Sequence, residues 1–509
     1  MSLSTELEKD IESFVNQAMQ AWNVPGLVLV VVKDDQVMIS KGFGIREMGK
    51  PDLVDEHTLF AIGSNTKAFT ATAIGLLVQD GKLAWDDPVS KHLPDFKMYD
   101  PHATDLLTVR DLLCHRSGLG TWAGDVLLYS DAPTAEIARR IRHLKPDFSF
   151  RGAYGYSNLM FIVAGEVIQV VSGMTWFEFV QQRIFEPLGM QDSLMGSGFL
   201  KSDTNVAVPH EDIKGKVQSI PYGKKKSNPR ASGSILASVA DISAWLKMQL
   251  NNGTLDGKRV INADIIAETH TPQTPIKLAA IEKELFPSRH FSAYGLGWFL
   301  SDIHGRFVVR HTGGVDGMLS SVVMIPEEQI GIAVFTNKLP NSAYIGIPQF
   351  ITEKLLGVPA QDWVEIYSEV EKREGEENVV KAARSQAEKN AARVQDTQPS
   401  LALEKYAGAY ENALLGGATI GLEGDALSGE AISKRGGFHI QLHVNESLSG
   451  TLEHWHYDSF VCKWDNPVLG ESLIPFISDG QGEVAEFRVK IREDWIDPVE
   501  HVFRKIYRS

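Results

Sequence analysis

The sequence predicts an α+β protein: an antiparallel sheet flanked by helices, with a helical subdomain, followed by a small all-β, barrel-like C-terminal domain. Strand-like runs occur near the N-terminus and again between about residues 294 and 335, with mostly helical patterns between them. Sheets assembled from both ends of a helix-rich segment are typical of α+β domains. We expect a first domain over 1–360, a charged helical linker over 361–400 and the β-domain over 401–509.

The first elements are a helix and a hairpin. Apolar residues recur at helical spacing over residues 5–22, and Thr5-x-x-Glu8 fits a capping box. Two strand-like runs follow, Leu27–Val32 and Val37–Lys41. The polar residues between them predict a hairpin turn, so an antiparallel strand pair is expected near the N-terminus.

The next helix begins near Ser64 and is apolar almost all round, so we expect it inside the domain. Gly63 allows the chain to turn into this helix, and Gly81 ends it. Ser64 would lie in the first turn, where free backbone N–H groups and the helix dipole stabilise an oxyanion. Lys67 lies one turn on, and a lysine removed from water can act as a base. A serine cap beside a solvated lysine is the alternative, and this pair alone leaves both open.

The region that follows predicts a helical subdomain. A short helix is expected to end at Gly118, with Cys114 and His115 as packed residues rather than a nucleophile and a base. Glycines and aromatics then place Tyr156 and Asn158 on a loop at a helix start, where both can face one cleft. A helix cap beside a packed tyrosine is the alternative for these two residues. The helices expected here cover residues 135–144, 157–172 and 175–185.

The second half of the first domain returns to strands. Residues 200–233 are polar and irregular, and the basic run Lys224-Lys225-Lys226 is expected to be a solvated loop. After helices at 239–250 and near 261–269 we expect strands at Tyr294–Leu300, Phe307–His311, Ser320–Ile325 and Gly331–Phe335, and a closing helix at Ile347–Leu356. The second of these strands ends in His311-Thr312-Gly313-Gly314. Glycines there would let a substrate backbone lie against the sheet edge, and an exposed N–H can bind an oxyanion.

Composition excludes some functions. The 509 residues carry a net charge of −15 with a pI of about 5.5, which argues against a general binder of nucleic acids or anionic membranes. The two cysteines, Cys114 and Cys462, form no disulfide framework or zinc site by themselves, and we expect neither a metal nor a cofactor. The N-terminus shows no basic region followed by an apolar core, so a cytoplasmic location is expected, with a truncated secreted or periplasmic form as the alternative.

Three motifs, taken in order, resemble those of the penicillin-recognising serine hydrolases. They are Ser64-x-x-Lys67, Tyr156-Ser157-Asn158 and His311-Thr312-Gly313. The resemblance is to the class C β-lactamase branch, which includes D-aminopeptidases, D,D-carboxypeptidases and esterases, and it covers about residues 5–357. The tail resembles the β-rich C-terminal domain often appended in this branch.

The resemblance implies a role for each motif residue. Ser64 would attack a carbonyl and form an acyl-enzyme, while Lys67 and Tyr156 would share the proton transfers. Because coupled groups share their protons, the sequence leaves open which of the two is the base. Asn158 would orient Lys67 and hold the substrate amide, and the backbone N–H groups of Ser64 and Gly314 would form the oxyanion hole.

The third motif departs from the β-lactamase pattern. Its first residue, His311, stands where β-lactamases of this branch carry a lysine, and we include it among the catalytic residues. Thr312, Gly313 and Gly314 would bind substrate with Asn158. Histidine is only partly charged near neutral pH, which favours a peptidase or esterase acting on a small molecule or short peptide. A β-lactamase and a non-catalytic penicillin-binding receptor remain the alternatives, and the sequence leaves open a homo-oligomer.

Overall fold

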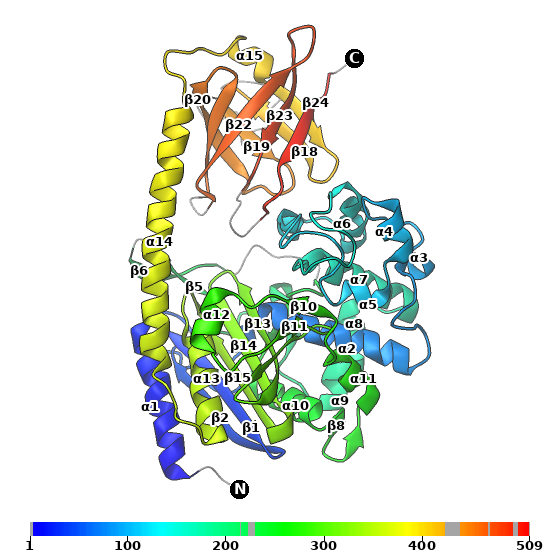
Figure 1. Ribbon diagram of the computed structural model, residues 1–509, viewed down its shortest axis with the longest axis vertical. Helices are drawn as coiled ribbons and strands as arrows, with labels where there is room; N and C mark the ends of the chain where they lie inside the picture. The colour runs from blue at the N-terminus through cyan, green and yellow to red at the C-terminus, as the bar shows by residue number, and fades with distance from the viewer. Residues whose placement is uncertain are drawn as a thin grey trace.

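The computed structural model describes residues 4–213, 215–221, 230–422, 438–466, 469–491 and 497–507. The basic run Lys224-Lys225-Lys226 lies outside these ranges. Figure 1 shows a sheet with its covering helices, a helical region beside it, a barrel above that region, and one long helix that reaches from the sheet to the barrel. The predicted α+β class with a C-terminal barrel is confirmed.

The central sheet has eight antiparallel strands in the order β10-β11-β12-β13-β14-β15-β1-β2. Their bounds are β1 (Gly26–Lys33), β2 (Gln36–Gly44), β10 (Thr274–Ile276), β11 (Ser292–Tyr294), β12 (Phe299–Ile303), β13 (Arg306–Val315), β14 (Met318–Ile325) and β15 (Ile330–Thr336). Strand β1 pairs with both β2 and β15, so the two ends of the domain meet in the sheet as expected. A turn formed by Asp34 and Asp35, both at positive φ, joins β1 to β2, which is the geometry of a tight hairpin.

Helices cover both faces of this sheet, as Figure 1 shows. Alternate residues of β1 enter two separate hydrophobic cores: Val28 and Val30 pack on one face, and Leu29 and Val31 pack on the other. The first core contains α2 (Thr66–Gln79) and α10 (Val239–Leu250), and the second contains α1 (Thr5–Ala21), α13 (Ala343–Leu356) and the start of α14 (Trp363–Ala392). This strand is therefore buried on both sides, which explains its continuous apolar sequence.

The capping box predicted at the start of α1 is wrong by one residue. Ser4 is the cap: its backbone is extended and its Oγ accepts a hydrogen bond from the N–H of Leu7 at 3.2 Å. Thr5 is already helical, so its side chain does not cap the helix.

Two strand predictions need correction. The run Tyr294–Leu300 is the end of β11, a turn and the start of β12, because Gly297 takes φ +79° and breaks the strand. The motif that starts at His311 does not follow its strand, since β13 continues to Val315. The region predicted to be irregular also contains a short hairpin, β5 (His210–Ile213) and β6 (Lys216–Ser219).

The helical region is built around a buried helix, α7. Its main helices are α3 (Val89–His92), α4 (Pro101–Leu106), α5 (Val109–Leu112), α6 (Thr134–Arg140), α7 (Asn158–Ser172) and α8 (Trp176–Val180), with a 3₁₀ helix, η2 (Asp125–Tyr129). The helix predicted to end at Gly118 ends at Leu112 instead. The chain leaves it sharply, and His115 takes φ +59°.

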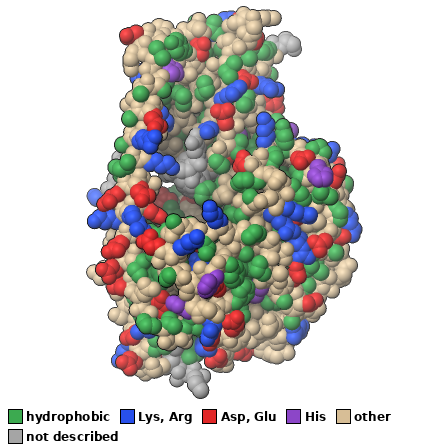
Figure 2. All heavy atoms as spheres, viewed as in Figure 1, with side chains coloured by type: hydrophobic (Ala, Val, Ile, Leu, Met, Phe, Trp, Pro, Cys, Tyr) green, Lys and Arg blue, Asp and Glu red, His purple; other side chains and the backbone are tan. Residues whose placement is uncertain are grey.

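The C-terminal domain is a closed antiparallel barrel of eight described strands. They are β17 (Gly408–Asn412), β18 (Gly416–Gly421), β19 (His439–Leu442), β20 (Ser449–His456), β21 (Ser459–Trp464), β22 (Glu471–Ser478), β23 (Val484–Val489) and β24 (His501–Lys505). Helix α14 joins it to the first domain, and Figure 2 shows acidic and basic side chains mixed along this part of the surface. Within the described ranges no single helix has the length and apolarity to cross a membrane, although the bent pair Asn158–Ser172 and Trp176–Leu188 passes by length and composition alone.

Candidate active site

Ser64 lies on a short 3₁₀ turn, η1 (Gly63–Asn65), that leads directly into α2. Gly63 takes φ +50°, a conformation that favours glycine, and so turns the chain into the helix. The turn is attached to the sheet through Ser320 of β14, whose Oγ accepts from Asn65 Nδ2 at 2.8 Å and donates to the carbonyl of Ile62 at 2.7 Å. Ser64 is thus held between a buried helix and the sheet.

Lys67 is fully buried in the first turn of α2, with its ammonium group next to Ser64. Its Nζ lies 2.9 Å from Ser64 Oγ, 2.6 Å from Asn158 Oδ1 and 2.8 Å from the carbonyl oxygen of Ser232. Burial lowers the pKa of Lys67 from 10.5 to about 7. A large fraction of the amine is therefore neutral near pH 7, and a neutral amine at this distance can accept the proton of Ser64.

Tyr156 lies next to both Ser64 and Lys67. Its ring centroid lies 4.8 Å from Lys67 Nζ, and its side chain hydrogen-bonds to Ser64. Burial raises the pKa of Tyr156 above its usual value, so the phenol keeps its proton at neutral pH. Tyr156 is placed to donate a proton, whereas Lys67 is placed to accept one.

Asp125 is a further residue of the site, in addition to those predicted from the sequence. This residue begins η2, and its Oδ2 accepts a hydrogen bond from Asn158 Nδ2 at 2.6 Å. Asn158 thereby connects Lys67 to a buried carboxyl group. Burial raises the pKa of Asp125 and lowers that of Lys67, which brings the two towards each other, so these two connected groups compete for a proton. Asp125 can be recognised as a site residue only from its contact with Asn158 in the folded structure, because no local sequence motif surrounds it.

His311 is buried, and the hydrogen bonds that fix its ring go to Thr312 and Tyr294. Its Nδ1 donates to the carbonyl of Thr312 at 2.6 Å, which leaves Nε2 to accept from the hydroxyl of Tyr294 at 2.8 Å. Burial, together with the charge of Lys67, lowers the pKa of His311 to about 3. The expected partial charge is therefore wrong, because the ring is neutral at physiological pH.

The remaining third-motif residues bring β13 against the nucleophile turn. A Cβ on Gly63 would lie 2.8 Å from the backbone N of Gly314, and a Cβ on Gly313 would lie 2.0 Å from the carbonyl oxygen of Ile62. Glycine at both places permits this approach, which puts the Gly314 amide next to the Ser64 turn. Among the described strands, β12 pairs with β13 only as far as Arg310, so Thr312 and its neighbours have a strand partner on the β14 side alone.

Comparison with known proteins identifies the fold that carries this site. The family model described as Beta-lactamase matches residues 11–354, which is most of the chain. The chain belongs to this family. A second model, described as a domain of unknown function (DUF3471), matches residues 392–502 of this β-lactamase-family protein.

Three known proteins are similar to this chain in sequence or in fold. "Unguisins hydrolase ungD" of Aspergillus violaceofuscus is 29% identical over 398 residues, which are 72% of this chain and 68% of that protein. The octameric penicillin-binding protein homologue from Pyrococcus abyssi has the same fold, with a TM-score of 0.60 and 24% identity over 98% of this chain and 99% of that one. The D-stereospecific amidohydrolase from Streptomyces sp. superposes with a TM-score of 0.50 and 23% identity over 64% of this chain and 94% of that one. The β-lactamase-family protein described here is a serine hydrolase.

Cys114 and His115 are packed as expected. Burial raises the pKa of the Cys114 thiol to about 12, so this free cysteine is a poor nucleophile. His115 Nδ1 accepts from the backbone N–H of Ser157 at 3.1 Å, and its ring packs 4.2 Å from that of Tyr156. His115 therefore supports the loop that carries Tyr156 and Asn158.

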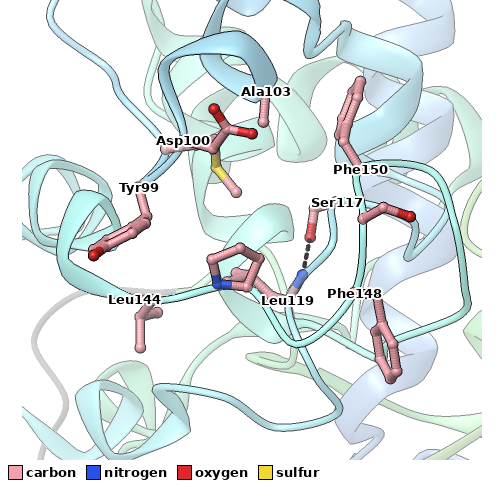
Figure 3. Close-up of a pocket in the computed structure, with 11 residues that line it drawn as sticks. Tyr99, Asp100, Ala103, Ser117, Leu119, Leu144, Phe148 and Phe150 are labelled. Atoms are coloured by element: carbon pink, nitrogen blue, oxygen red, sulfur yellow. Dashed lines mark hydrogen bonds between the residues drawn. The ribbon is translucent and has the colours of Figure 1, made fainter.

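A separate cavity of about 120 Å³ lies in the helical region, next to Asp100 and Ala103 at the start of α4, as Figure 3 shows. It is mostly apolar and is lined by residues that include Met98, Leu119, Leu144, Phe148 and Phe150. None of the predicted site residues lines it, so it carries no part of the proposed chemistry. Within the described ranges, no three His, Cys, Asp or Glu side chains are grouped as metal ligands.

Proposed function

We propose that this serine hydrolase cleaves an amide or ester bond through an acyl-enzyme on Ser64. The observation that carries the proposal is the position of Lys67, a fully buried amine 2.9 Å from Ser64 Oγ with a pKa lowered to about 7. The activity that fits best is that of a peptidase, similar to a D-aminopeptidase or a D,D-carboxypeptidase, or of an esterase on small esters.

The first half-reaction follows from the protonation states. Neutral Lys67 accepts the proton of Ser64 as Oγ attacks the substrate carbonyl. The backbone N–H groups of Ser64 and Gly314 bind the oxyanion of the tetrahedral intermediate. Tyr156 donates its proton to the leaving amine or alkoxide and recovers one from Lys67. This leaves the acyl group on Ser64 and returns Lys67 to its neutral form.

The second half-reaction uses the same groups for water. Neutral Lys67 accepts a proton from a water molecule, which attacks the acyl carbonyl. The proton passes to Ser64 Oγ as the acyl group leaves. Asn158 holds Lys67 through its Oδ1, which keeps the amine aligned with Ser64 in both steps.

The edge of β13 that faces away from β14 favours a substrate with a peptide-like backbone. Among the described strands, this one has a pairing partner from Thr312 onward on the β14 side only, so its other edge can bind an extended backbone by strand addition. The hydrolase and amidohydrolase names of the relatives agree with amide cleavage, and the amidohydrolase is D-stereospecific. A homo-oligomer is also proposed, since one protein of the same fold is octameric.

The neutral His311 argues against an efficient β-lactamase. A substrate carboxylate needs a cation to offset its loss of hydration. His311 offers none, because its pKa is lowered to about 3 and its Nε2 accepts from Tyr294. A non-catalytic receptor is disfavoured for another reason, since Ser64, Lys67 and Tyr156 are all present and in contact.

A fluorophosphonate probe tests the proposal directly. We expect the probe to label the wild-type protein at Ser64, because an activated hydroxyl attacks phosphorus as it attacks a carbonyl. Mass spectrometry of the labelled peptide measures this, and the Ser64→Ala variant is the control. If the folded wild-type protein takes no label and turns over neither D-alanyl p-nitroanilide nor p-nitrophenyl acetate, the receptor alternative is correct.

His311→Lys is expected to change substrate preference. A lysine there adds a cation to β13, the strand proposed to bind the substrate, so the KM of a peptide with a free C-terminal carboxylate should fall about tenfold relative to the KM of its amide. Steady-state kinetics on the matched pair measure the ratio. His311→Gln removes the imidazole without adding charge and should leave that ratio unchanged. An equal ratio in the lysine variant and the wild type would show that position 311 does not face the substrate carboxylate.

A further inference from the structure

The C-terminal barrel contacts the helical region at η2, the element that carries Asp125. Asn445 Nδ2 donates to the carbonyl of Tyr129, the last residue of η2, at 2.5 Å. At the other end of this short helix, the backbone N–H of Gly124 donates to Asp497 Oδ1 at 3.1 Å. Both ends of η2 are therefore held by the barrel domain.

Asp497 is a fully buried carboxylate in the segment between β23 and β24. His501 binds it through Nε2 at 3.0 Å, and the backbone N–H of Val499 donates to it at 3.1 Å. Buried carboxylates require such partners to offset the loss of hydration. The backbone N–H of Gly124, the residue directly before Asp125, also donates to this carboxylate. Asp497 therefore binds groups from both domains.

A chain of contacts then leads from Asp497 to the nucleophile. Gly124 places Asp125, whose Oδ2 accepts from Asn158 at 2.6 Å, and Asn158 accepts from Lys67 at 2.6 Å. The other oxygen of Asp125, Oδ1, is buried and has no hydrogen-bond partner among the described residues. A carboxyl group with one unpaired buried oxygen favours the protonated state.

The charge of Asp497 acts in the same direction. It raises the pKa of Asp125, while the charge of Lys67 lowers it. When Asp125 holds the proton, Lys67 loses the negative neighbour that would stabilise its ammonium form. The barrel carboxylate thus favours neutral Lys67, which is the form that activates Ser64.

The other titratable groups around the pair are neutral at physiological pH. Burial is the largest cause that lowers the pKa of His115 and that of His311. Burial and the charge of Asp125 raise the pKa of Tyr156. Asp497 is therefore the remaining charge that acts on the Lys67–Asp125 pair in this part of the described structure.

We propose that Asp497 is a positioning residue for catalysis: it fixes Gly124 and Asp125 against Asn158, and its charge keeps the shared proton on Asp125 rather than on Lys67. This inference rests on the proposed function. In this role the barrel domain supplies a residue that positions the catalytic groups, in addition to any role of the barrel in binding or assembly.

The pH dependence of Ser64 labelling tests this role. The second-order rate of fluorophosphonate labelling of the full-length protein should rise with pH as Lys67 loses its proton. In Asp497→Asn we expect this rise to move to higher pH by about half to one unit, since Asp125 then ionises more readily and stabilises the ammonium form of Lys67. At pH 6 the variant should react about three- to tenfold more slowly than the wild type, and at pH 9 at nearly the same rate.

Two further variants separate this role from a structural one. Asn445→Ala removes the other bond between the barrel and η2 and should leave the pH profile unchanged. Asp125→Asn should move the profile to lower pH, because an amide cannot ionise and so cannot stabilise the ammonium form of Lys67. If Asp497→Asn does not fold, Asp497→Ser removes the same charge with a smaller side chain.

The outcomes distinguish this proposal from the proposed function. No labelling of the folded wild-type protein means that the acyl-enzyme mechanism is wrong. Wild-type labelling with the same profile in Asp497→Asn, or with an equal shift in Asn445→Ala, means that Asp497 only joins the domains.

Discussion

Replacing Lys67 by methionine is expected to lower kcat/KM by about a thousandfold or more, because this side chain accepts the proton of Ser64. Methionine fills a similar volume but offers no base, and Tyr156 cannot replace it while burial holds the phenol in its protonated form. Lys338→Met is the matched control: Lys338 is also buried and binds a backbone carbonyl, but it lies outside the site. Activity on p-nitrophenyl acetate measures the effect, and a loss of less than tenfold would assign the base to another group.

The same substitution should change the pH dependence of stability. The pKa of Lys67 is lowered from 10.5 to about 7 on folding, so keeping this group buried costs several kcal/mol below pH 7. That cost disappears as the pH rises from 7 to 10.5, and the wild-type free energy of unfolding should rise over this interval. Lys67→Met removes this contribution, so its Tm relative to the wild type should fall between pH 7 and pH 9. A Tm difference that is constant with pH would show that Lys67 is solvated in solution.

The sequence predicts those parts of the fold and site that depend on local spacing. Ser64 and Lys67 meet because they lie three residues apart at the start of a helix. The strand Leu27–Val32 could be recognised because burial on both faces requires an apolar residue at every position. The prediction of one strand over Tyr294–Leu300 is wrong for a local reason. One glycine at positive φ divides this run into the end of one strand, a turn and the start of the next strand, and the composition of the run does not indicate this.

The residues that could not be predicted act through contacts between distant segments. Asp125 lies 33 residues from Asn158, and Gly124 lies 373 residues from Asp497. Neither spacing has a periodic signal, so only the folded structure brings these groups together. The charge state of His311 is a similar case, because it depends on burial and on the hydroxyl of Tyr294 rather than on the neighbouring residues in the sequence.

Gly313→Ala is expected to reduce kcat/KM by about a hundredfold or more, without changing any side chain that takes part in proton transfer. The added Cβ would lie 2.0 Å from the carbonyl oxygen of Ile62 and 2.5 Å from Ser320 Oγ, so β13 must move away from the nucleophile turn. That movement carries the Gly314 amide away from Ser64. Loss of one oxyanion donor costs about 10²- to 10³-fold in kcat in other serine hydrolases.

Gly233→Ala provides the control for this substitution. Gly233 also faces the nucleophile turn, but a Cβ there would lie 3.8 Å from the nearest atom, the carbonyl carbon of Gly63, which is ordinary van der Waals contact. This variant should retain activity within about threefold of the wild type. Thermal unfolding of both variants shows whether the fold is kept. If Gly313→Ala remains folded with wild-type kcat/KM, the oxyanion hole does not involve Gly314, and the close approach of β13 to the Ser64 turn serves packing alone.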